Sequence, residues 1–124
     1  MFAQLAGPAY WSSWGNLNMI AHLNLYKYAS QTVEPYLKSD LNNFNSIASK
    51  QGNIWRVPHA YTWATLYSFM SVASSSMIYK NVIDDASPYD RMSTDVYNYT
   101  LGQNNWGVSM IITDKIPGSV KNVF

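Results

Sequence analysis

The chain has no cysteine and very little charge. Its 124 residues include 8 Lys or Arg and 7 Asp or Glu, which gives a formal net charge of +1. Without cysteine there can be no disulfide, thiolate zinc site, iron–sulfur cluster or thiol nucleophile. Without a basic excess there is no stripe of cations to neutralise phosphates, so we expect no nucleic-acid partner.

Motifs that carry enzymatic chemistry are also missing. The two histidines, His22 and His59, have no carboxylate at helical spacing, whereas a metal site needs three or four converging ligands. The six glycines form neither a dinucleotide-binding fingerprint nor a nucleophile elbow. We therefore expect no enzymatic activity, no metal and no cofactor, and we interpret both histidines as structural.

Apolar and aromatic residues are plentiful instead. Hydrophobic residues make up 48% of the chain, which contains 10 Tyr and 5 Trp. This is enough for one core or for burial against partners, and we favour burial against partners. The length corresponds to a single domain, 1–124.

The first part of the chain is expected to be an arm followed by helices. Residues 1–15 show no sustained period and predict an extended arm anchored by Trp11 and Trp14. Residues 16–50 are predicted to be helical. The first part has a loose helical pattern of apolar residues at Leu17, Ile20, Leu23 and Tyr28. The second part is predicted to begin after an N-cap at Thr32. Its apolar residues form a regular stripe, which consists of Val33, Leu37, Leu41, Phe44 and Ala48.

Residues 60–79 form the longest uncharged stretch and predict a single transmembrane helix. Twenty helical residues would extend about 30 Å, the thickness of a bilayer's hydrocarbon core. Arg56 and Lys80 flank the stretch, as cations do at a membrane interface. Its weakness is composition, because seven of the twenty residues are Ser or Thr. The expected interface anchors, here and elsewhere in the chain, are Trp11, Trp14, Trp55, Trp63, Tyr79 and Trp106.

Two faces of this predicted helix differ in size. A small face, on which a neighbouring helix could pack closely, contains Ala60, Ala64, Ser68, Ser71 and Ser75. A bulky face, expected to meet lipid or neighbouring side chains, contains Trp63, Leu66, Met70, Ala73 and Met77. The hydroxyls are expected to bond to backbone carbonyls one turn back, which lowers the cost of burying them.

The last part, 81–124, is polar and rich in turn residues, and we interpret it as a partner-facing tail. Within it, the alternating stretch 106–113 predicts one short strand. A lone strand must pair with another segment or with a different chain.

Together these features predict a mainly α fold: a single-span membrane helix with amphipathic helices, an N-terminal arm and a C-terminal strand. Small, low-charge, single-span chains resemble in type the supernumerary subunits of mitochondrial respiratory-chain or ATP synthase assemblies, although no motif identifies a family. We therefore expect a non-catalytic accessory subunit of a membrane complex, in the mitochondrial inner membrane, contacting other subunits and lipid. The alternative is a soluble, mainly helical structural or binding module, such as a virion component or a glycan-contacting protein, in which 60–79 is a central helix.

Overall fold

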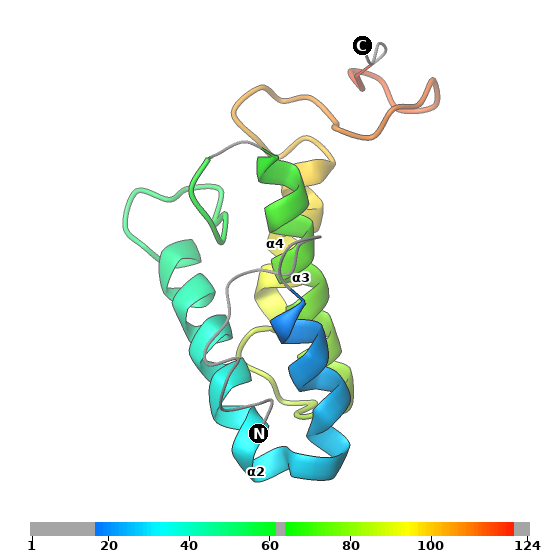
Figure 1. The fold of residues 1–124 in the computed structure, drawn as a ribbon. Coiled ribbons are helices and arrows are strands. Elements are labelled where there is room, and N and C mark those ends of the chain that lie inside the picture. Colours follow the sequence, from blue (N-terminus) through cyan, green and yellow to red (C-terminus); the bar gives the residue numbers. More distant parts are fainter. Residues whose placement is uncertain (1–16, 62–63, 121–124) are drawn as a thin grey trace.

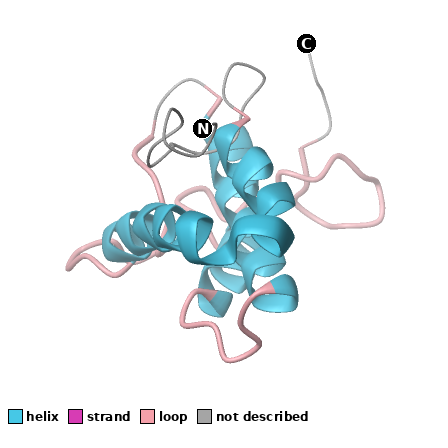
Figure 2. Cartoon of the chain, turned by 60° about the horizontal axis from the view of Figure 1, so that its bottom comes forward, coloured by secondary structure: helices cyan, strands magenta, loops and turns pink. Residues whose placement is uncertain are grey.

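The structure, a computed structural model, describes residues 17–61 and 64–120, and in these ranges it contains three α-helices. They are α2 (Asn18–Ala48), α3 (Thr65–Val82) and α4 (Asp90–Thr100). Figure 1 shows α3 and α4 side by side, with α2 bent into two arms beside them. Figure 2 shows these helices joined by loops, with no strand in the described ranges. The prediction of a mainly α fold is confirmed.

Helix α2 bends at Ala29, whose backbone angles (φ −146°, ψ 46°) are not helical. The bend separates a first arm, 18–28, from a second arm, 30–48. Thr32 lies inside the second arm, so its prediction as an N-cap is wrong. The apolar stripe of this arm is confirmed, because all of its members are at most 1% exposed: Val33, Leu37, Leu41, Phe44 and Ala48.

The first arm of α2 buries a different face from the one predicted. Leu17, Ile20 and Tyr28 are exposed, whereas Met19 and His22 are 1% exposed. The face that packs inward is therefore displaced by one or two positions from the apolar pattern. The arm consequently turns large apolar side chains outward, next to α3.

Helix α3 does not have the predicted bounds of 60–79. Ala60 lies in a loop, and Ala64 precedes the helix in a left-handed conformation (φ 58°). That conformation is costly for a residue with a Cβ atom and interrupts any helix that would continue from upstream. At the other end the helix extends to Val82. In the ranges 17–61 and 64–120, none of the helices combines the length and the apolar character needed to cross a membrane.

Four of the five serine hydroxyls of α3 bond to backbone carbonyls three or four residues earlier, as expected, whereas Ser71 Oγ is buried without a hydrogen-bond partner among the described residues. Ser68 Oγ donates to the Thr65 carbonyl at 2.8 Å, and Ser75 Oγ donates to the Ser71 carbonyl at 2.9 Å. Ser76 Oγ donates to the Ala73 carbonyl at 2.9 Å. These local bonds satisfy hydroxyls that would otherwise be costly to bury.

The core lies on the inner side of α3 and forms two clusters. The first contains Met19, Val33, Leu37, Leu41, Phe44, Val72, Tyr79, Tyr89 and Met92. The second contains Val57, Phe69, Ala73, Val96 and Tyr99. Tyr79, expected to anchor a membrane interface, is instead 1% exposed in the first cluster and packs edge-on against Tyr89, with ring centroids 5.3 Å apart.

The predicted C-terminal strand, 106–113, is wrong. The described chain has only one isolated bridge in this region, between Ser109 and Ser119. The reason is the side chain of Asn104, whose Oδ1 accepts the backbone N–H groups of Trp106 and Val108 at 3.0 and 3.3 Å. These two N–H groups are therefore bonded within a turn and cannot donate to a neighbouring strand. The tail, interpreted from its sequence as polar and rich in turns, also contains α4.

A partly buried ion pair fixes the loop between α2 and α3 to α4. Arg56 Nε donates to Asp95 Oδ2 at 2.7 Å, and Arg91 Nε lies 3.4 Å from the same oxygen. Asp95→Ala removes the shared acceptor, and we expect the free energy of unfolding to fall by about 1–2 kcal/mol. Urea denaturation measures this loss.

The control is Asp90→Ala. Asp90 Oδ2 pairs with Lys80 Nζ at the same 2.7 Å, but both side chains are more exposed. We expect a loss below about 1 kcal/mol there, because solvent screens an exposed pair. Equal losses at the two sites would contradict the role given to Arg56.

Candidate functional site

Helix α3 presents an uncharged side to solvent. This outer face of α3 consists of Tyr67, Met70, Ser74, Met77 and Ile78, all of which are exposed. The four large apolar side chains among them are 39–50% exposed. The inner side of the same helix is fully packed, so α3 is apolar on both sides while only one side is covered by the described chain.

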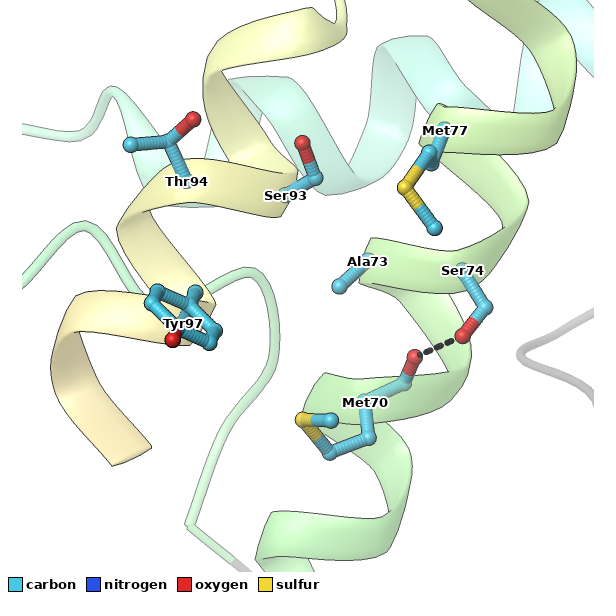
Figure 3. A pocket seen from close by; sticks show the side chains of 7 residues that line it. All are labelled: Met70, Ala73, Ser74, Met77, Ser93, Thr94 and Tyr97. Atoms are coloured by element: carbon cyan, nitrogen blue, oxygen red, sulfur yellow. Dashed lines mark hydrogen bonds between the residues drawn. The ribbon is translucent and has the colours of Figure 1, made fainter. Parts of the chain in front are cut away.

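A groove between α3 and α4 borders the outer face on one side. Its cavity volume is about 300 Å³. Figure 3 shows the side chains that line it, which come from both helices: Met70, Ala73, Ser74, Met77, Ser93, Thr94 and Tyr97. The figure also shows the hydrogen bond that Ser74 Oγ donates to the Met70 carbonyl at 2.8 Å. This bond holds the serine hydroxyl against its own helix.

A second groove lies on the other side of the outer face, between α3 and the first arm of α2. Its volume is also about 300 Å³, and its lining residues are Ile20, Leu23, Tyr67, Met70, Ser71, Ser74, Ser75 and Ile78. Met70 and Ser74 line both grooves, so they form a ridge between them. None of the described residues that line either groove carries a charge. The two grooves and the ridge make one continuous apolar surface.

The predicted small face of α3 is only partly brought together. Ala60 and Ala64 lie before the helix and are exposed, so they share no helical face with the three serines. Ser68 and Ser75 are buried, while Ser71 is half-buried. Ser71 and Ser75 line the groove between α3 and the first arm of α2 in the same chain.

The predicted tryptophan anchors differ in how exposed they are. Trp11, Trp14 and Trp63 lie outside the described residues. Trp55 is half-buried and packs against the second core cluster. Trp106 is 62% exposed, as an anchor for a partner would be.

Both histidines of the chain are buried. Within the described ranges no group of three or more His, Cys, Asp or Glu side chains could hold a metal ion. His59 is buried, and its Nδ1 lies 2.9 Å from the Ala60 carbonyl oxygen. His22 is 1% exposed and stacks on Tyr36, with ring centroids 5.3 Å apart.

The burial of His22 predicts a pH dependence of stability. Neither ring nitrogen has a hydrogen-bond partner among the described residues, and desolvation lowers the pKa of His22 below its usual 6.5. The unfolded chain therefore binds a proton more readily than the folded chain. We expect stability to be full above pH 6.5 and to be lost as the pH falls from 6.5 through the lowered pKa.

Urea denaturation of the wild type and of His22→Phe, measured between pH 7.5 and pH 5, tests this expectation. Phenylalanine keeps a ring on Tyr36 but cannot take up a proton. We expect the variant to lose clearly less stability on acidification than the wild type. Parallel pH profiles would show that His22 does not contribute.

Sequence reasoning missed two parts of this surface. Tyr97 and Ser93 belong to α4, for which no helix was predicted. Its apolar residues nevertheless recur at the helical steps of three, four and three, at Tyr89, Met92, Val96 and Tyr99. Ile20 was expected to face inward.

Comparisons of this chain with protein-family models, with curated proteins and with solved structures found no match.

Proposed function

We propose that this protein is a non-catalytic structural subunit that is held in a multi-subunit assembly by the outer face of α3. The observation that supports this is the uncharged surface formed by that face and its two bordering grooves. Contiguous exposed apolar surface of this kind is typical of protein interaction sites. In this proposal the protein binds other subunits and catalyses no reaction.

The partner we propose is an apolar helix of another subunit. A helix presents ridges of side chains, and such ridges fit into the grooves between the side-chain rows of a neighbouring helix. The ridge at Met70 and Ser74, with a groove on each side, offers this relief. Met70 and Met77 are flexible and polarisable, so they can adapt to the surface that covers them.

A membrane complex, such as a mitochondrial respiratory-chain or ATP synthase assembly, is the setting that we propose from the sequence. In that setting α3 lies between helices, with α2 and α4 on its inner side and a foreign helix on its outer face. Carbonate extraction of membranes from the source cells tests whether the protein is held in a membrane complex.

The substitution Ser74→Glu tests the assembly. Ser74 is exposed on the ridge, so the glutamate can point to solvent in the free protein but would be buried without a partner charge in the assembly. We expect the variant to fold normally and to migrate as the free protein in native electrophoresis of cell extracts. The wild type should migrate with the complex.

The matched control is Ser39→Glu, because Ser39 is an exposed serine in the second arm of α2 and lines neither groove. This variant should assemble like the wild type. Normal assembly of Ser74→Glu would contradict the proposal. A wild type that is monomeric and aqueous in its source would instead favour the alternative, a soluble structural or binding module such as a virion component.

A further inference from the structure

A tryptophan at the end of the helix bundle is fixed in place and yet exposed. Trp106 is 62% exposed, whereas Asn104, two residues earlier, is 3% exposed. Asn104 uses its whole side-chain amide to hold the surrounding turn. Its Nδ2 donates to the carbonyls of Tyr99 and Val108, both at 2.8 Å, and its Oδ1 accepts the N–H groups of Trp106 and Val108. The backbone that carries the indole is therefore ordered before any ligand binds.

The indole borders a pocket that is separate from the outer face of α3. The pocket has a volume of about 410 Å³, within the range of small-molecule sites. Its apolar lining includes Tyr61, Leu66, Trp106 and Met110, and no residue of the outer face of α3 belongs to it. No charged side chain is found among its described lining residues.

Aromatic packing behind the pocket positions Tyr61. Its ring lies 5.9 Å from that of Phe69 and 6.5 Å from that of Tyr99, and the Phe69 and Tyr99 rings are 5.5 Å apart. Burial, followed by the hydrogen bond to Tyr61, raises the pKa of Tyr99, so this phenol stays neutral at physiological pH. Tyr61 itself is 50% exposed. The described lining of the pocket thus presents two exposed aromatic rings and no charge: Tyr61, which packs on Phe69 and Tyr99, and Trp106, which is carried by the turn that Asn104 holds.

We infer that this pocket binds a neutral sugar ring. The C–H bonds on a face of a pyranose carry a small positive charge and are attracted to the electron-rich face of an aromatic ring. Trp106 and Tyr61 provide such faces, and the lining also includes Asn105, an exposed residue whose amide can bond to sugar hydroxyls. A charged ligand would lose its hydration without gaining an opposite charge. The inference does not rest on the proposed role of α3.

The test uses cellotetraose, a β-linked glucose oligomer whose ring C–H bonds are all axial and so form apolar faces. It is titrated into the full-length, ¹⁵N-labelled protein, and the tryptophan indole N–H signals are followed by NMR. The Trp106 signal is identified as the one absent from Trp106→Ala. We expect this signal to shift saturably in the wild type. In Trp106→Ala and Trp106→Phe, which lack this indole, the Kd is followed through the backbone amide signals of the other pocket residues, and we expect it to be at least about tenfold weaker in Trp106→Ala, with Trp106→Phe between the two.

Tyr97→Ala is the matched control, since Tyr97 is 58% exposed but lines the groove between α3 and α4. It should bind cellotetraose like the wild type. Absence of any saturable shift at Trp106 with cellotetraose, mannotetraose or chitotetraose would overturn the inference. Tighter binding of a sulfated oligosaccharide than of these neutral ones would also overturn it, because the pocket would then recognise charge. A pocket that binds a protein partner and none of these sugars would likewise overturn the inference.

Discussion

Phe44→Ala is expected to lower the free energy of unfolding by about 3–5 kcal/mol, the largest loss among the variants considered. Phe44 is 1% exposed and belongs to the cluster in which α2 packs against α3. Truncation removes its apolar contacts and leaves a cavity that the surrounding helices fill only in part. Urea denaturation followed by far-ultraviolet circular dichroism measures the loss.

Met77→Ala is the comparison for Phe44→Ala, because Met77 is a large apolar residue on the outer face of α3 and is 50% exposed. In the isolated protein we expect its loss to be below about 1 kcal/mol, since half of its surface stays in water on folding and its truncation leaves no enclosed cavity. A loss equal to that of Phe44→Ala would mean that the outer face is buried in the free chain. The apolar surface available for a partner would then not exist.

Asn104→Ala is expected to have the second largest effect, a loss of about 2–3 kcal/mol. The substitution leaves the carbonyls of Tyr99 and Val108 and the N–H groups of Trp106 and Val108 without their present partner. Each buried polar group left unsatisfied costs roughly 1–3 kcal/mol, and water that enters the loosened turn recovers part of this. We also expect faster hydrogen exchange at the Trp106 and Val108 amides.

Asn105→Ala provides the control for Asn104→Ala. Asn105 is the next residue and has the same side chain, but it is exposed. Its substitution should change stability by no more than about 0.5 kcal/mol and leave the two amide exchange rates unchanged. Similar effects of the two substitutions would show that the turn is not held by the Asn104 amide.

The sequence predicted the second arm of α2 well because its pattern is redundant. Five apolar residues at steps of four, four, three and four leave one helical face to bury, and all five are buried. In the first arm the apolar residues are scattered around the helix. Burial of His22 could not be read from that pattern, because a lone histidine carries no apolar signal and its burial depends on the ring of Tyr36.

The candidate site was predicted only in part because its parts meet through tertiary structure. Met70 and Met77 were expected on a face that meets lipid or neighbours, and both are exposed. The grooves beside them depend on the bend at Ala29 and on the existence of α4. No local signal marks Ala29 as a bend, whereas α4 was hidden by polar residues among its evenly spaced apolar ones.

The two clearest errors arose from reading hydrophobic runs without their backbone constraints. The stretch 106–113 alternates like a strand, but the side chain of Asn104 binds the backbone N–H groups of Trp106 and Val108. The uncharged run 60–79 is continuous in composition, but the left-handed Ala64 separates its beginning from the helix. In both cases the backbone conformation at or near a single residue, and not the composition of the stretch, determined the secondary structure.

The central claim is that α3 packs its inner side on its own chain and its outer face on another subunit. Site-specific photo-crosslinking tests this claim most directly. The photoreactive residue p-benzoylphenylalanine replaces Met77 in the cells that produce the protein, and cross-linked peptides are identified by mass spectrometry. The account predicts one main protein adduct, to an apolar helical segment of another chain. The same residue at Tyr28, which is 77% exposed and lines neither groove, should give no such adduct. Adducts at Met77 to lipid alone, or none beyond those found at Tyr28, would contradict the claim.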